Sequence, residues 1–267
     1  MSFEKDLQDL NYIPETTIEG DGLPRISWLS STKRGGILGK FYARASQMPG
    51  LTAPWEAVEL FDDEEGFVTP SLDLCIIRTR AQAYSETIVG DRRVRTWHPQ
   101  WKPDAGMRIY TELLCYIKGY EGLVVWPVKG LIGKGVCAVR NPDSVFGRMR
   151  EVEKEAKKTA TRPIPSFAFW TPVVCPTDRK GKPVLTSTGH GSEVIIPVAA
   201  VPDVIDRDVC AKLYVGSAML QQARAAWQEY EGWSRELRSN EPDDAPQAPS
   251  PRNAPSPFDQ DDASEGF

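Results

Sequence analysis

The sequence contains little histidine and no closely spaced cysteines. Only His98 and His190 can supply imidazole chemistry, and no HxxxH or CxxC spacing is present. Five cysteines lie far apart along the chain, which indicates buried thiols of a reducing compartment: Cys75, Cys115, Cys137, Cys175 and Cys210. The composition therefore gives no support for a zinc site or a disulfide framework, and we expect no metal or cofactor.

Long hydrophobic runs and nucleotide-binding motifs are also missing. No window approaches the roughly eighteen apolar residues of a membrane span, and the N-terminus lacks the basic and apolar regions of a secretory signal. Gly39-Lys40 and Gly133-Lys134 fail the P-loop pattern, because Phe41 and Gly135 stand where a hydroxyl residue is required. These absences predict a cytoplasmic protein that does not bind a membrane and does not hydrolyse nucleotides.

Charge is distributed unevenly along the chain. The sequence has 37 acidic and 32 basic residues, and residues 240–267 hold seven of the acids and one of the bases. The rest of the chain therefore carries 30 acids and 31 bases, close to neutrality. The low overall pI thus reflects the C-terminus and does not argue against binding of nucleic acid by the rest of the chain.

The C-terminus is a proline-rich stretch that ends in acids and one aromatic residue. Six prolines lie between Asn240 and Pro257, with almost nothing able to build a core, so we expect a flexible stalk. A solvating tail without a partner remains the alternative. Acids and the terminal phenylalanine form the tip, and these are its candidate partner-binding residues: Asp259, Asp261, Asp262, Glu265 and Phe267.

This C-terminus resembles the tails of the single-stranded DNA-binding proteins of bacteria and some phages. The bacterial tail closes on Asp-Asp, two small or apolar residues including proline, and Phe, whereas Glu265-Gly266-Phe267 closes this chain. The resemblance implies that the tail recruits replication and repair enzymes and competes with DNA for the protein's own basic groove. It also implies a bacterial or phage-infected cell.

Hydrophobic alternation predicts a body of short strands. Strands are expected at 26–29 and 72–83, a hairpin over 107–128, and further β segments at 166–174 and 193–198. With the helices described next, this set predicts a mainly β fold of the α+β class. An OB-like barrel with long loops is the first choice, and a partly open sheet is the alternative.

Two helices interrupt or follow this β body. Asn141 as N-cap and Pro142 at the first helical position predict one helix, and a second is expected from about Asp208 to Leu237. The first has one apolar face: Val145, Met149, Val152 and Ala156. We divide the chain into a flexible arm (1–22), a nucleic-acid-binding body (23–205), a helix packed on it (206–238) and a disordered tail (239–267).

The segment from Arg92 to Lys102 combines positive charge with aromatic rings and contains no acid. Single-stranded nucleic acid needs cations for its phosphates and flat rings for its exposed bases. Residues of this segment and of the preceding strand are the candidate contacts: Arg78, Arg80, Tyr84, Arg92, Arg93, Arg95, Trp97, Trp101 and Lys102. The alternative is that the two tryptophans turn inward as core anchors.

A second basic set, Lys129, Lys134 and Arg140, lies among glycines that predict a turn where the backbone can approach a phosphate closely.

Together these features predict a non-enzymatic single-stranded DNA-binding protein of replication, recombination and repair, for which a homo-oligomer is one possible state. The main alternative is an interaction or structural protein with a solvating tail. A third is an enzyme that holds Mg²⁺ through the acids at 62–65.

Deletion of residues 240–267 should tighten the binding of single-stranded DNA. The deleted segment carries a net charge of −6 and, on a flexible tether, competes with phosphates for the basic segment at high effective concentration. The increase in affinity should be largest at low salt, where screening is weakest. Oligonucleotide titrations of the full and truncated chains check this, and an unchanged or weaker affinity would contradict it.

Overall fold

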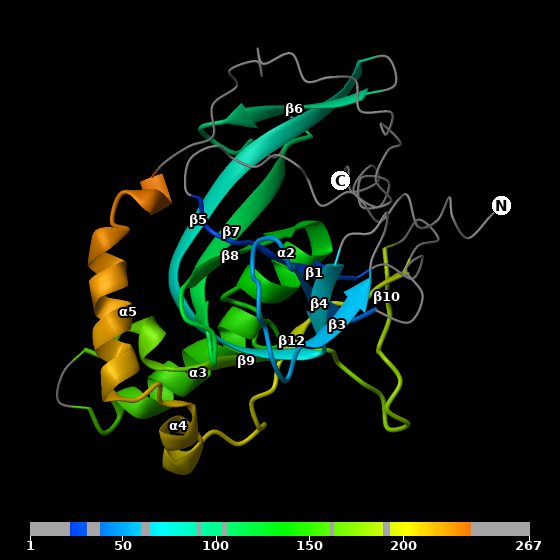
Figure 1. The fold of residues 1–267 in the computed structure, drawn as a ribbon. Helices are drawn as coiled ribbons and strands as arrows, with labels where there is room; N and C mark the ends of the chain where they lie inside the picture. Colours follow the sequence, from blue (N-terminus) through cyan, green and yellow to red (C-terminus); the bar gives the residue numbers. More distant parts are fainter. Residues whose placement is uncertain are drawn as a thin grey trace.

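A computed structural model describes residues 22–30, 38–59, 65–89, 92–102, 106–160, 163–188 and 193–235 (Figure 1). The predicted arm, apart from Gly22, and the predicted tail lie outside the described residues. Within the described part, the chain is mainly β with helices, and its sheets are open and antiparallel. The α+β class predicted from the sequence is therefore confirmed.

The largest sheet is built around one very long strand, β5, in the order β12-β9-β5-β7-β8, with β6 also paired to β5. Its strands are β5 (Ser71–Val89), β6 (Arg92–His98), β7 (Arg108–Ile117), β8 (Leu123–Lys129), β9 (Thr171–Val174) and β12 (Val198–Ala199). The predicted hairpin over 107–128 is confirmed as β7 and β8. The basic segment, where local alternation predicts no strand, forms β6.

β5 has different partners along its length. It pairs with β9 over 71–74, with β7 from Leu74 to Tyr84, and with β6 over 83–89. Because Tyr84 is paired to both β6 and β7, these two strands lie on opposite edges of β5. Figure 1 shows the β5–β6 hairpin extending away from the smaller sheet. We call residues 79–89 of β5, β6, and residues 108–112 of β7 the distal sheet.

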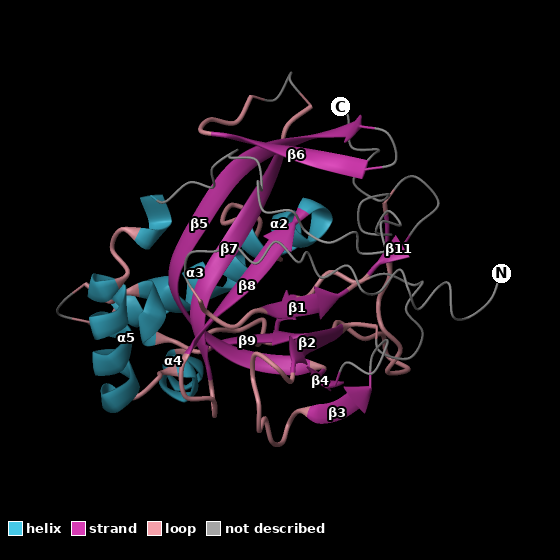
Figure 2. Cartoon of the chain, turned by 45° about the horizontal axis from the view of Figure 1, so that its top comes forward, coloured by secondary structure: helices cyan, strands magenta, loops and turns pink. Residues whose placement is uncertain are grey.

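A smaller sheet covers one face of β5, β7 and β8 in the part of the large sheet that lies outside the distal sheet. It has the order β1-β2-β4-β3, with β1 (Ile26–Leu29), β2 (Lys40–Arg44), β3 (Glu56–Glu59) and β4 (Glu65–Thr69). A two-stranded sheet joins β10 (Thr186–Ser187) to β11 (Glu193–Val194). In Figure 2 the smaller sheet lies on one side of the long strands and α4 and α5 on the other.

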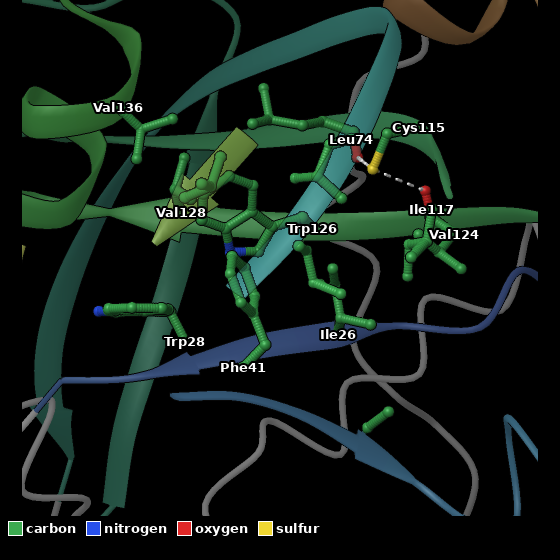
Figure 3. Close-up of a cluster of buried hydrophobic side chains, with 14 of the residues drawn as sticks. Ile26, Trp28, Phe41, Leu74, Cys115, Ile117, Val124, Trp126, Val128 and Val136 are labelled. Carbon is green, nitrogen blue, oxygen red and sulfur yellow. Dashed lines mark hydrogen bonds between the residues drawn. The ribbon is translucent and has the colours of Figure 1, made fainter. Parts of the chain in front are cut away.

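The main core lies between the two larger sheets and is centred on three aromatic rings. The ring of Phe41 meets Trp28 at 4.9 Å and Trp126 at 5.2 Å, both edge to face (Figure 3). Each such pair contributes about 0.5–1.5 kcal/mol beyond the burial of its surface. The Trp28 indole N–H also donates a 2.7 Å hydrogen bond to the Ile195 carbonyl, so this polar atom is satisfied inside the core.

The first predicted helix is present, but it starts three residues later than expected. α3 (Val145–Lys157) has Ser144 as N-cap, whose hydroxyl accepts a 2.9 Å hydrogen bond from the Gly147 N–H. The Asn141 side chain instead accepts from the Asp143 N–H in the preceding turn. The predicted N-cap is therefore wrong, whereas the apolar face is confirmed, since Val145, Met149 and Val152 are buried.

The single long helix predicted over 208–237 is wrong. The chain forms α4 (Arg207–Leu213), α5 (Ser217–Glu229) and a short 3₁₀ turn, η5 (Trp233–Arg235). At the end of α4, the carbonyl of Leu213 accepts a 2.7 Å hydrogen bond from the N–H of Trp170, which follows another 3₁₀ turn, η4 (Ser166–Ala168). Gly216 then turns the chain with a φ of 85°, and this non-local pairing ends the first helix.

The glycine-rich segment after β8 is a helix, α2 (Gly130–Cys137), and not the predicted turn. A side chain at Gly135 would place its Cβ 2.1 Å from Cγ2 of Ile196, so the glycine allows a close approach of helix and neighbouring chain. From the sequence, the glycines here were expected to let the backbone approach a phosphate. In the structure, Gly135 instead lets α2 pack closely against Ile196.

Glu112 joins three distant parts of the chain. Its carboxylate accepts from Arg25 at 2.8 Å and from Nε and Nη2 of Arg80 at 2.9 and 2.7 Å. The Arg80 guanidinium lies 4.2 Å from the ring centroid of Trp233 in η5. Glu112 is almost fully buried, so the N-terminal strand, the large sheet and the C-terminal segment share one ion cluster.

Replacement of Glu112 by Gln should destabilise the protein by about 3–5 kcal/mol, because it removes a buried negative charge that two largely buried guanidinium groups contact. Urea unfolding followed by circular dichroism measures this loss. The control is Glu121→Gln, at an exposed position in the β7–β8 turn, which should change stability by no more than about 0.5 kcal/mol. A similar small effect at Glu112 would show that the cluster contributes little.

Candidate nucleic-acid interface

The distal sheet has one charged face and one uncharged face. Side chains that are directly paired across strands share a face, and successive residues alternate. The charged face holds Arg80, Gln82, Tyr84 and Glu86 of β5, Arg95 and Trp97 of β6, and Arg108, Tyr110 and Glu112 of β7. The uncharged face holds Thr79, Ala81, Ala83, Ser85, Thr87, Val94, Thr96, His98, Ile109 and Thr111.

Three aromatic rings pack together on the charged face. The ring of Trp97 lies 5.5 Å from Tyr84 and 5.6 Å from Tyr110. Tyr84 is 1% exposed and Tyr110 is also buried, while Trp97 is half-buried. In this packing Tyr84 offers almost no surface to a base and Trp97 packs across three strands. The alternative that both tryptophans turn inward therefore fits Trp97.

Two arginines of the charged face share one carboxylate. Nε of Arg95 lies 2.6 Å from Oε1 of Glu86, and Nη1 of Arg108 lies 3.2 Å from Oε2. The Arg95 guanidinium is also 5.6 Å from the ring centroid of Tyr84. Arg95 is a candidate predicted from the sequence, whereas Glu86 and Arg108 are not, because a cross-strand register cannot be read from local spacing.

Two other candidate arginines fasten the C-terminal segment to β5. The side chain of Arg78 donates to the backbone carbonyl of Trp227 in α5, with Nε at 3.0 Å and Nη2 also in contact, and its guanidinium lies 4.5 Å from the Trp227 ring centroid. Arg80 binds Glu112 and lies against Trp233, as described above. In this arrangement both arginines hold the fold together.

Trp101 and Lys102 are exposed members of the predicted segment. Trp101 is 51% exposed, and its indole N–H donates to the Met107 carbonyl at 3.2 Å, which fixes one edge of the ring. Lys102 is exposed. Arg92 and Arg93 begin β6, next to the hairpin tip, and their side chains are outside the described part of the structure.

The second basic set does not form one surface. Lys129 in β8 is paired directly with Tyr110 and therefore borders the charged face. Lys134 belongs to α2, and Arg140 follows that helix, with both side chains exposed. Val136 of α2 packs in the main core with Val128, on the opposite face of β8 from Lys129. Only Lys129 therefore extends the charged face.

The described residues give little support for metal-ion or thiol chemistry. They contain no group of three His, Cys, Asp or Glu side chains that could hold a metal ion. Burial raises the pKa of Cys75 and of Cys137 to about 12, which makes both thiols poor nucleophiles near neutral pH. His190 and the acids at 62–64 are outside the described residues, as are the tail-tip residues Asp259, Asp261, Asp262, Glu265 and Phe267.

Within the part of the chain that the structure describes, no helix is both long and apolar enough to cross a bilayer. Comparison of the chain with protein-family models, with curated proteins and with solved structures gives no match.

The two tryptophans of the predicted segment should differ in their contribution to stability. Trp97→Ala should cost about 3 kcal/mol, since it removes a ring that packs on two tyrosines. Trp101→Ala should cost no more than about 0.5 kcal/mol, because half of the side chain is already exposed. Urea midpoints of the two variants test this difference. Equal losses would show that Trp101 also belongs to the packed interior.

Proposed function

We propose that the protein binds single-stranded DNA during replication, recombination or repair and has no enzymatic activity of its own. The half-exposed indole of Trp101, beside the exposed Lys102 at the end of a basic strand, is the observation that carries this proposal. An accessible ring can stack a base, and the adjacent cation can neutralise a phosphate. The sequence from Arg92 to Lys102 places no acid among them.

The surface proposed for the strand runs along the distal sheet. Trp101 and Lys102 supply its accessible end, Arg92 and Arg93 lie on the same hairpin, and Lys129 borders the charged face. OB-folds bind single strands across such antiparallel sheets, and an OB-like role for this body is part of the proposal. Trp97, Tyr84, Arg78 and Arg80 pack or form hydrogen bonds within the fold and are not proposed as its main contacts.

The tail has the second role in the proposal. Its acids steer the chain toward a basic partner surface, while the side chain of Phe267 provides an apolar anchor. Replication or repair enzymes of a bacterial or phage-infected cell are the partners that this chemistry suits. In this proposal the body of the chain binds DNA and the tail recruits the partner enzymes.

A protein-interaction role is the second candidate, and a different observation favours it. The distal sheet exposes three large aliphatic side chains: Ile88 at 74%, with Val94 and Ile109 each near half. Exposed apolar side chains are one feature of protein interfaces. Ile88 alternates with Thr87 in β5 and therefore lies on the charged face. Val94 and Ile109 lie on the uncharged face, so this second candidate uses the side of the sheet that offers no charge to DNA.

A fluorescence titration with oligo(dT) at two salt concentrations tests the first candidate. Binding should quench tryptophan emission, and the affinity should fall steeply with salt. Trp101→Ala should weaken binding by about 1–3 kcal/mol with little change in the salt slope, and Trp101→Phe should retain most of the affinity because it keeps a stacking ring. Normal binding by the alanine variant would remove Trp101 from the site.

Lys102→Gln should reduce the magnitude of the salt slope by about 0.7, the value for one phosphate contact on a single strand. The matched control is Lys118→Gln. Lys118 is also exposed and pairs with Asp73 at the proximal end of β5, so its removal changes the net charge equally. Equal effects of the two substitutions would indicate non-specific attraction, and absence of quenching by the unaltered protein would favour the protein-interaction role.

A further inference from the structure

Glu86 lies on the charged face, toward the hairpin end of the distal sheet. It lies in β5 directly opposite Arg95 of β6, and Arg108 of β7 reaches it from the other side. The two carboxylate oxygens are used separately: Oε1 contacts Arg95 at 2.6 Å and Oε2 contacts Arg108 at 3.2 Å. Two cations from flanking strands therefore converge on one oxyanion.

These three side chains are only partly removed from water. The exposed fraction of the side chain is 10% for Glu86, 15% for Arg95 and 25% for Arg108. Such a cluster is screened less than a pair on the open surface, yet it remains within reach of a ligand. Tyr84 lies beside the Arg95 guanidinium, which fixes the direction in which this arginine presents its donors.

A phosphodiester presents the same chemistry as the carboxylate of Glu86. Both groups carry one negative charge spread over two oxygens, and guanidinium groups bind both through charge-assisted hydrogen bonds. Two arginines held close enough to share one carboxylate are therefore close enough to share one phosphate. The obstacle is Glu86 itself, which reduces the charge of the cluster from +2 to +1.

We propose that Glu86 is a built-in competitor for backbone phosphates and that it sets the affinity of the distal sheet for single-stranded DNA. The inference rests on the proposed function. A phosphate of the bound strand exchanges with the carboxylate on Arg95 and Arg108, and no covalent bond changes. Because each hydrogen bond that these arginines donate to DNA replaces one that they donate to Glu86, the strand is released more easily than from an uncompensated pair of arginines.

Glu86→Gln tests this inference, because it keeps the size of the side chain and removes its charge. The variant should bind oligo(dT) about tenfold more tightly at low salt, and its salt slope should be steeper by about 0.7, the value for the one phosphate that the two arginines share. The double variant Glu86→Gln, Arg95→Gln should show little of this increase. Should Gln disturb folding, Glu86→Thr also removes the carboxylate and retains a residue that suits a strand.

The control is Asp73→Asn, which makes the same change in net charge and frees Lys118 at the other end of β5. It should raise the affinity much less than Glu86→Gln. An equal increase in both variants, or an affinity that Glu86→Gln lowers or leaves unchanged, overturns the inference while the proposed function stands. Failure of the unaltered protein and of every variant to bind oligo(dT) overturns the proposed function and this inference with it.

Discussion

The carboxylate of Glu112 needs positive charge beside it, because it is almost fully removed from water in the middle of the large sheet. Arg25 and Arg80 provide that charge from positions 87 and 32 residues away in the sequence. Trp233 then lies against Arg80 and brings the C-terminal segment onto the same face. Segments near both ends of the described chain therefore meet the large sheet at the Glu112 cluster. The distal sheet extends away from this cluster.

Strand register decides which side chains of the distal sheet are available. The charged face holds its arginines in pairs with Glu86 and Glu112, and its rings pack on one another. Trp101 and Lys102, which come shortly after β6 in the chain, are exposed. A binding function for this sheet therefore depends on the residues at its margin and on how firmly the paired arginines are held.

Local patterns predicted the elements whose causes are local. Alternation predicted the β7–β8 hairpin, and helical spacing predicted the buried face of α3, because each pattern reports which side of an element meets the core. The prediction of one long C-terminal helix was wrong, because the Leu213 carbonyl accepts a hydrogen bond from the N–H of Trp170, which is distant in the sequence. The role of Gly135 was misread for the same reason, since Ile196 lies far away in the sequence.

The sequence by itself determined the segregation of charge, the lack of metal and nucleotide motifs, and the acidic end that resembles the tails of single-stranded DNA-binding proteins. These properties depend only on composition and order. The tertiary structure alone decided that Arg78 and Arg80 fasten the fold, that Trp97 packs while Trp101 is exposed, and that Glu86 lies between Arg95 and Arg108. Each of those outcomes depends on which strand lies beside which, and strand pairing is a long-range property that local spacing does not encode.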